Sequence, residues 1–352
     1  MTENIYTSSS YFATELRTIF RRNWICAGFA SQIPELGDIV PVTVGGLPLM
    51  LVRGESRDVR VFHNVCRHRG STLIDAPCQG RKMIRCPYHS WVYSLSGDLV
   101  QRPHFDGPDK HSATETHLWS VNSRTWGDLI FVHIDTPEVE FDSFIAPLKA
   151  IGEAYGISDA NFDETIDITI DANWKLLVEN FVDGYHVASV HPTLERSVPT
   201  RTHKFRTEPP LFIGEAPRNT GEHGSYVSGL PEFPDVSESV RGTLTYISVF
   251  PNLCVNMTSD RFSVYLMRPE APDRSQEVIC NYYASAAFAV STEELRRSMT
   301  RNQIAFNAED IDALVQLQIG RGSDIYDTGQ PSPYWDTNAE GFLAMCGAGV
   351  QS

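Results

Sequence analysis

The amino-acid sequence predicts an α+β protein, in which a small antiparallel β domain precedes a larger domain of mixed helices and strands. Short β-rich runs separated by turn residues fill positions 36–135. Strand patterns return at 166–170 and between 242 and 284, and two helical patterns lie among them. A length of 352 residues is also typical of about two domains.

The first elements are a helix and a series of short strands. Apolar residues from Phe12 to Trp24 recur with helical spacing over 10–24, and Ser10 is a suitable N-cap. The runs that follow are β-rich and are divided by turn residues, at 38–44, 47–53, 59–65 and 129–134. The segment 93–98 is typical of a hairpin turn. Together these patterns predict a small all-β domain.

The later elements mix both types. A polar stretch containing Pro137 and Pro147 leads to a half-buried strand near 166–170 and to a helix that begins at Asn173 and ends before Pro192. Residues 196–240 are rich in Pro, Gly, Ser and Thr, so we expect long loops there. Further strands are predicted at 242–256, 261–268 and 276–284. A capping box at 291–294 opens a long helix, which Gly320 and Gly322 end.

Composition excludes several classes of function. The net charge is −15, which disfavours binding to nucleic acid or to anionic membranes. No apolar run approaches the roughly 18 residues of a membrane span, and the N-terminus lacks the features of a signal peptide. The seven cysteines are scattered, which fits reduced thiols. We therefore expect a cytoplasmic protein.

The first candidate site is a pair of short ligand motifs. The sequence reads Cys66-x-His68, then seventeen residues, then Cys86-x-x-His89. Two thiolates and two imidazoles suit a Rieske [2Fe–2S] cluster, in which Cys₂ holds one iron and His₂ the other. A zinc site is the alternative, but zinc fingers pair like ligands, whereas each pair here combines one Cys with one His. The motif favours the Rieske cluster.

Basic residues lie between and beside these ligands. Against the single acid Asp75, the segment carries Arg67, Arg69, Arg81, Lys82 and Arg85. Such a basic rim could dock an acidic redox partner. Alternatively, Arg67 and Arg69 only order the cluster loops and the others form a solvated face. The sequence leaves both interpretations open.

A second set of polar residues lies at the end of the predicted helix near 174–191. His186 and His191 are five residues apart, and Asp183 precedes His186 by one helical turn. Glu179 and Asn180 lie just before them, and a helix rarely buries so many polar groups without a function. Two histidines and a distant carboxylate would form a facial triad for iron.

The third ligand is expected from the long C-terminal helix. Ile304, Ala308, Ile311, Leu314 and Val315 predict its apolar face, and Glu309 and Asp310 lie nearest to that face. Asp310 is preferred over Glu309 and Asp312. The histidine pair or the acid alone would be weak evidence, and the preceding Rieske motif strengthens the assignment.

These motifs, in this order, resemble the catalytic α subunit of a Rieske non-haem iron oxygenase of the aromatic-ring-hydroxylating type. The resemblance implies an antiparallel Rieske domain at 36–140 and a helix-grip (START-like) catalytic domain with mononuclear iron at 141–352. An N-terminal helical segment at 1–35 would pack on the catalytic domain. The metal ligands would be His186, His191 and Asp310, and the cluster ligands Cys66, His68, Cys86 and His89. Tyr88 and Trp91 match positions packed around the cluster, and Ser90 departs from a frequent Gly.

The resemblance also implies a homotrimer. In it, Asp183 would bridge His186 to the cluster ligand His89 of the neighbouring subunit, and Asn180 and Glu179 would line this junction. Electrons would come from NAD(P)H through a separate flavin or iron–sulfur reductase or a ferredoxin. The iron would use O₂ to hydroxylate a small substrate.

The expected substrate is a small aromatic compound, because an Asp at position 183 resembles the aromatic-acting branch of the family, and the short chain resembles members that act as homotrimers on small substrates. The alternatives are oxidative O- or N-demethylation or quaternary-amine oxidation, since an aromatic pocket suits a planar ring and a quaternary ammonium alike. A Rieske electron carrier without catalytic iron would leave some 200 residues after the Rieske domain unexplained.

Overall fold

The structure is a computed structural model that describes residues 4–105, 116–218, 229–327 and 329–351. The chain forms two compact units. We call Leu16–Val139 the β unit, and Met1–Glu15 with Glu140–Ser352 the mixed unit. The division falls within helix α1 (Ser9–Thr18). The predicted helix over 10–24 ends earlier than expected, because the chain turns after Thr18 and strand β1 starts at Ile25.

The β unit consists of antiparallel strands in three small sheets over its described residues, ordered β1-β9-β8, β2-β3-β4 and β5-β6-β7. The strands are β1 (Ile25–Phe29), β2 (Ile39–Val44), β3 (Leu47–Arg53), β4 (Val59–His63), β5 (Ile84–Arg85), β6 (Val92–Tyr93), β7 (Leu99–Gln101), β8 (Asn122–Trp126) and β9 (Leu129–His133), with a 3₁₀ turn at Ala30–Gln32. One core cluster packs Met50, Phe62 and Tyr93 around Cys66 and Cys86. The cluster motif is therefore anchored in the core of this unit.

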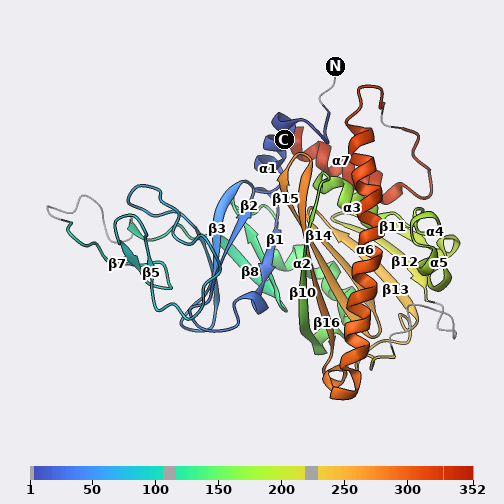
Figure 1. Cartoon of the computed structure of the whole chain (residues 1–352), viewed down its shortest axis with the longest axis horizontal. Helices are drawn as coiled ribbons and strands as arrows, with labels where there is room; N and C mark the ends of the chain where they lie inside the picture. Colours follow the sequence, from blue (N-terminus) through green and yellow to red (C-terminus); the bar gives the residue numbers. More distant parts are fainter. Residues whose placement is uncertain (1–3, 106–115, 219–228, 328, 352) are drawn as a thin grey trace. The chain divides into compact units, whose positions relative to one another are not determined.

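The mixed unit is built on an antiparallel sheet of seven strands within the described residues, in the order β10-β16-β15-β14-β13-β12-β11. The strands are β10 (Ala160–Ile170), β11 (Lys204–Glu208), β12 (Leu211–Pro217), β13 (Thr243–Val249), β14 (Leu253–Thr258), β15 (Arg261–Ala271) and β16 (Arg274–Ala284). Figure 1 shows the long helix α6 lying across this sheet. The α+β class and the architecture of a helix held against an antiparallel sheet agree with the sequence prediction.

The helices of the mixed unit come before, within and after the sheet. They are α2 (Phe141–Ala154), α3 (Trp174–Val182), α4 (Val187–Val190), α5 (Pro192–Ser197), α6 (Glu293–Arg321) and α7 (Thr337–Gln351). Short 3₁₀ turns occupy Ile157–Asp159, Thr200–Thr202, Ser285–Phe288 and Val290–Thr292. Within the described residues, no helix is both long enough and apolar enough to cross a lipid bilayer.

Two expectations about these elements were wrong, and two helices were not predicted. The described part of the predicted loop at 196–240 contains the end of α5 and the strands β11 and β12, because β12 pairs along its whole length with the apolar strand β13. The sequence did not predict α2, which carries Pro147 in its interior, or α7. The capping box at the start of α6 is not formed, since Thr292 makes no side-chain cap hydrogen bond.

Candidate functional site

The two cluster-ligand loops of the β unit have the same backbone geometry. In the first, the Gly70 N–H donates to the Cys66 carbonyl at 3.0 Å, and in the second the Ser90 N–H donates to the Cys86 carbonyl at 3.1 Å. The closing residue is left-handed in both, with φ of 73° at Gly70 and 58° at Ser90. Glycine tolerates this conformation, whereas serine holds it at a cost. Each Cys therefore starts a five-residue turn that also contains the His of its pair.

The four predicted cluster ligands meet. Cys66 and Cys86 are buried at the base of the loops, and the rings of His68 and His89 are 4.6 Å apart between centroids. The Nδ1 atoms of both histidines are buried and have no hydrogen-bond partner among the described residues. Because buried polar atoms are normally paired, two orphaned imidazole nitrogens beside two buried thiols fit ligation of a [2Fe–2S] cluster.

Neighbouring side chains hold these ligands in place. The Trp91 ring stacks on His68 with centroids 4.8 Å apart, and the Tyr88 ring lies 3.7 Å from that of His89. The Tyr93 hydroxyl lies 3.3 Å from the Cys66 sulfur and accepts the Arg67 backbone N–H at 3.1 Å. Burial raises the pKa of the Cys66 thiol. Ligation of iron would lower this pKa again, because the metal binds the thiolate form.

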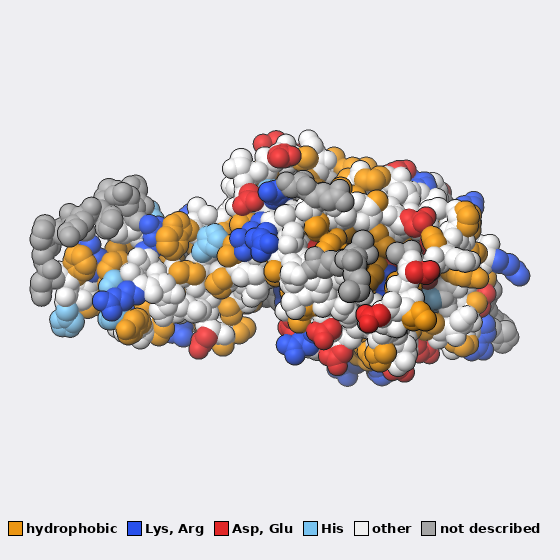
Figure 2. All heavy atoms as spheres, turned by 90° about the horizontal axis from the view of Figure 1, so that it is seen from above, with side chains coloured by type: hydrophobic (Ala, Val, Ile, Leu, Met, Phe, Trp, Pro, Cys, Tyr) orange, Lys and Arg blue, Asp and Glu red, His pale blue; other side chains and the backbone are white. Residues whose placement is uncertain are grey.

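The basic residues around this site fall into two groups. Arg67 is fixed, because its guanidinium donates to the His117 carbonyl at 2.5 Å and lies 3.9 Å from the Trp119 ring centroid. Arg69, Arg81, Lys82 and Arg85 are exposed. On the visible face in Figure 2, the β unit shows basic and histidine side chains and few acidic ones. Within the described part of the chain, Arg67 is the one of the five whose side-chain contacts order a cluster loop.

The second candidate site lies in the mixed unit, in a cavity of about 150 Å³. Its walls come from α3 and α6 and from the sheet strands β13 to β16. The cavity is smaller than the 300–1,000 Å³ typical of pockets for drug-sized ligands, so it suits a small molecule.

His186, His191 and Asp310 meet at this cavity. Their ligand atoms all lie within 4.8 Å of one another. The Asp310 Oδ1 atom is 2.9 Å from the His191 Nε2 and 3.5 Å from the His186 Nε2. Two imidazoles and one carboxylate that converge from one side match the ligand set of non-haem Fe(II). These residues fit the metal, which would supply the chemistry of O₂ activation.

A further carboxylate lies behind each histidine. Asp183 Oδ2 is 3.2 Å from the Nδ1 of His186, and Glu309 Oε2 is 2.7 Å from the Nδ1 of His191. Such carboxylates fix the tautomer and the ring orientation of metal-binding histidines. Burial alone would lower the pKa of His191, but the contacts with Asp310 and Glu309 outweigh it and raise the pKa.

The local sequence explains how these side chains converge, although not as one helix. Helix α3 ends at Val182, and Asp183 has extended backbone. Its Oδ1 accepts the Tyr185 N–H, and a Cβ at Gly184 would come within 2.4 Å of the His203 ring. His186 then precedes the single turn α4, and His191 precedes Pro192, the first residue of α5. The expectation that Asp183 and His186 share a helix face was therefore wrong, but their contact exists.

The inward face of α6 is also different from the expected one. Ile304 and Ala308 are exposed, whereas Gln303, Asn307, Asp310 and Leu314 line the cavity. The face is polar because its side chains have partners there. Asn180 on α3 donates its Nδ2–H to Asp310 Oδ1 at 2.9 Å, which links the two helices at the candidate iron site.

Sequence reasoning missed Glu277 on β16. This residue is only 5% exposed and lines the cavity, where its carboxylate accepts a hydrogen bond from Asn307 Nδ2. Burial, with a contribution from Asp310, raises the pKa of Glu277 to about 7. A signal was available, since Glu277 is the only charged residue between Arg274 and the end of an otherwise largely apolar strand.

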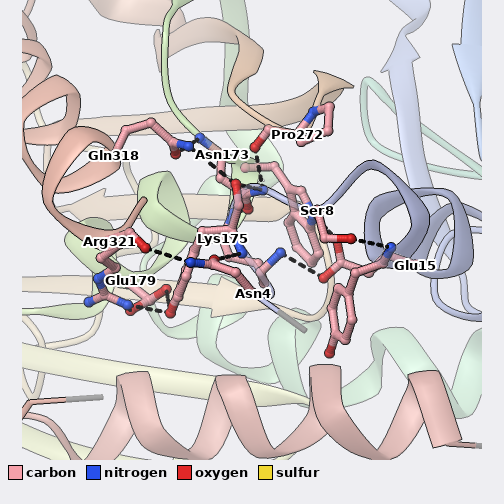
Figure 3. A network of polar contacts seen from close by, with 12 residues as sticks. Asn4, Ser8, Glu15, Asn173, Lys175, Glu179, Pro272, Gln318 and Arg321 are labelled. Carbon is pink, nitrogen blue, oxygen red and sulfur yellow. Dashed lines mark hydrogen bonds and ion pairs between the residues drawn. The ribbon is translucent and has the colours of Figure 1, made fainter. Parts of the chain in front are cut away.

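Glu179 does not line the cavity. Its carboxylate accepts the Tyr6 hydroxyl at 2.9 Å and pairs with Arg321, at the end of α6, at 3.0 Å. One turn earlier on α3, the fully buried Lys175 pairs with Glu15 at 2.7 Å. Figure 3 shows these groups joining the N-terminal segment, α3 and the end of α6. The geometry of Glu179 is that of a structural contact between elements.

Two protein-family models match the chain. A Rieske [2Fe-2S] domain matches residues 23–117, and the catalytic domain of the ring-hydroxylating alpha subunit matches residues 157–348. The second match covers more than half of the chain, in the segment that holds the iron-ligand candidates.

Curated relatives oxidise methylated amines, according to their names. Choline monooxygenase of Arabidopsis thaliana is 28% identical over 339 residues, which cover 92% of this chain and 77% of that protein. The glycine betaine monooxygenase oxygenase subunit of Pseudomonas aeruginosa is 33% identical over 193 residues, 55% of this chain and 45% of that protein. The carnitine monooxygenase oxygenase subunit of Escherichia coli is 27% identical over 195 residues, 55% of this chain and 52% of that protein. The last two matches span about half the length of those relatives.

Solved structures share the fold. Naphthalene 1,2-dioxygenase of Rhodococcus sp. superposes with a TM-score of 0.84 at 21% identity, covering 99% of this chain and 94% of that one. A quaternary ammonium Rieske monooxygenase superposes with a TM-score of 0.81, also at 21% identity and with the same coverage. At these identities the solved structures show the fold alone. The curated relatives matched by sequence favour the quaternary-amine alternative, and they do not support the expected aromatic substrate or a role in aromatic hydrocarbon catabolism.

Proposed function

Because the chain belongs to the Rieske oxygenase family of ring-hydroxylating alpha subunits, we propose that it is the oxygenase component that oxidises a small quaternary amine. The observation that carries this proposal is the chemistry of the named relatives, which act on choline, glycine betaine and carnitine. The small cavity with aromatic walls is consistent with it, since a quaternary ammonium is compact and is attracted to aromatic faces.

In this proposal, His186, His191 and Asp310 hold the catalytic iron, and Cys66, His68, Cys86 and His89 hold the Rieske cluster. Asp183 and Glu309 orient the two histidines through Nδ1. Asn180 orients Asp310 through its amide. The cavity walls would position the substrate beside the iron, which would supply the chemistry of O₂ activation.

Electrons would arrive from a separate reductase or ferredoxin, with Arg69, Arg81, Lys82 and Arg85 as the docking residues. Arg67 is less suited to docking because its guanidinium already has partners. In a homotrimer, Asp183 would link His186 to the cluster of the neighbouring subunit. In support, Asp183 and His186 are partly accessible, at 23% and 17% side-chain exposure. With iron supplied in excess, to offset any loss of affinity at His186, Asp183→Ala is expected to retain both metals and to slow reoxidation of the cluster at least a hundredfold, and unchanged reoxidation would contradict the link.

The function is tested by anaerobic single turnover. Chemically reduced holoenzyme is mixed with O₂ and, separately, with choline, glycine betaine, L-carnitine or a panel of aromatic acids. Cluster absorbance and product mass are followed together. We expect cluster reoxidation coupled to an oxygenated or demethylated product with at least one of the three amines. Coupled oxidation of an aromatic acid alone would overturn the proposal.

A further inference from the structure

We propose that Glu277 is the counter-ion that selects a cationic substrate, and that Asn307 holds its carboxylate at the wall of the cavity beside the candidate iron site. This inference rests on the proposed function and adds a specificity-determining residue to it. The two residues come from different elements, Glu277 from β16 and Asn307 from α6.

The first support is the burial of a carboxylate without a cationic side chain beside it. Glu277 is 5% exposed, and within the described residues no Lys, Arg or His pairs with its carboxylate. Buried carboxylates elsewhere in the mixed unit do have cations, as Glu15 pairs with Lys175 and Glu179 with Arg321. A buried charge costs free energy unless an opposite charge accompanies it. At a cavity wall, a cationic ligand can fill that role.

The second support is the arrangement of Asn307. Its Nδ2–H donates to Glu277, and its Oδ1 is buried and has no hydrogen-bond partner in the described part of the chain. Asn307 lies one helical turn before Asp310, and both residues line the cavity. A carboxylate and an unpartnered amide oxygen thus lie together near the iron ligand, and both are acceptors without a positive charge of their own.

The third support is aromatic. Phe181, Tyr246, Tyr265 and Phe306 line the same cavity. The Phe181 and Tyr265 rings are 5.1 Å apart, and Phe306 lies 6.0 Å from the His191 ring. Aromatic faces with a nearby carboxylate attract a cation that lacks N–H donors, whereas a neutral ring would leave the carboxylate without a partner.

The charges on the cavity wall are also separated. Arg261 lines the cavity and is the first residue of β15. Glu277 lies opposite Met267, which is six residues further along the same strand. Six residues of strand separate the two positions, which is roughly 20 Å along the sheet. Arg261 therefore cannot neutralise Glu277, and the wall next to the iron site is the anionic end.

The test compares pairs of ligands that differ only in the positive charge. Choline is paired with 3,3-dimethylbutan-1-ol, and glycine betaine with 3,3-dimethylbutanoate, in which carbon replaces the nitrogen. Calorimetry on anaerobic holoenzyme measures the dissociation constants for wild type and Glu277→Gln. The amide keeps the shape and an acceptor for Asn307. As a control, Asp167→Asn removes the same charge from an exposed residue on β10, the strand next to β16.

We expect Glu277→Gln to weaken binding of the oxidised quaternary amine at least tenfold, to leave binding of its carbon analogue, which lacks the positive charge, within twofold, and to raise KM far more than it lowers kcat. Asp167→Asn should leave the dissociation constants of both ligands unchanged. A structural defect would weaken the binding of both ligands of a pair. An equal loss of affinity for both ligands would therefore overturn the inference, as would an unchanged preference for the ligand that carries the positive charge. If the wild-type protein neither binds nor oxidises a quaternary amine, the result contradicts the proposed function itself and not only the role of Glu277.

Discussion

The two candidate metal sites are assembled in opposite ways. In the β unit, all four ligands lie between Cys66 and His89, on two turns that each close on their own cysteine carbonyl. In the mixed unit, His186 and His191 follow α3, whereas Asp310 comes from the middle of α6, more than a hundred residues later. The first site depends on local turn geometry and the second on the alignment of distant elements.

This difference predicts where each site is vulnerable. A ligand turn in the β unit needs a buried cysteine at its start and a residue with a left-handed backbone conformation at its end. The iron site needs α3 and α6 held together, which is the task of the Asn180–Asp310 contact and of the buried network of Tyr6, Lys175, Glu179 and Arg321. Variants of each kind should therefore separate the two sites.

The largest difference between the two sites is expected when a candidate metal ligand itself is replaced. Cys86→Ala removes a proposed cluster ligand and should abolish the visible absorbance of the cluster. His186→Ala should keep that absorbance and reduce turnover at least a thousandfold, because the facial triad loses one of three ligands. Iron and acid-labile sulfide analyses check both variants. A His186→Ala protein with wild-type turnover would exclude His186 as an iron ligand.

The next largest effect should come from a buried ion pair of the mixed unit whose two residues do not line the cavity. Lys175 and Glu15 are both fully buried at 2.7 Å, and removing one partner of such a pair costs about 3–5 kcal/mol. Lys175→Met is expected to lower the free energy of unfolding of the mixed unit by this amount, measured with urea. The double variant Lys175→Met/Glu15→Gln should recover much of the loss. Equal stability of the single variant and wild type would mean that the pair contributes nothing net.

Glu277 should make the stability of the mixed unit depend on pH. Because burial raises its pKa to about 7 from 4.5, the folded protein binds this proton more tightly than the unfolded chain. The stability of wild type relative to Glu277→Gln is therefore highest below pH 4.5 and falls as the pH rises to 7, by about 3 kcal/mol in total. Urea unfolding of iron-depleted protein between pH 4.5 and 8 measures the difference, since bound iron would lower the pKa. A difference that is constant with pH would contradict the raised pKa.

The same contrast explains what the sequence could predict. The cluster loops were predictable because each Cys–His pair is local in the sequence, so a single turn brings its two residues together. His186, His191 and Asp310 were proposed from residue type and order, and the family resemblance added weight. The second carboxylate Glu309 and the cavity wall residue Glu277 were not assigned these contacts, because they depend on the rotation of α6 and on strand register. Apolar periodicity misled at Ile304 and Ala308, since the inward face of α6 is polar where it lines the cavity.

Glu309 tests how far iron binding depends on distant alignment. Its carboxylate contacts the His191 Nδ1 at 2.7 Å, and loss of such a partner typically costs 10–100-fold in metal affinity. Glu309→Gln should therefore lower the affinity for mononuclear iron roughly tenfold, measured by competition with a chelator, and should leave the cluster spectrum unchanged. Asp312→Asn, an exposed acid on the same helix, is the matched control. Equal iron affinity in both variants would show that the contact does not orient His191.

The smallest effect is expected in the β unit, at the closing residue of the second ligand turn. Ser90 has a φ of 58°, the conformation that Gly70 adopts at the equivalent point of the first turn, and a side chain there costs about 1 kcal/mol. Ser90→Gly should remove this cost and raise the temperature at which the cluster bleaches by a few degrees, whereas Ser90→Ala keeps the Cβ and should give no gain. Thermal bleaching followed by visible absorbance compares the three proteins. If the glycine variant bleaches at or below the wild-type temperature, the turn gains more from the serine side chain than it loses to backbone strain, and local geometry alone does not set the stability of this site.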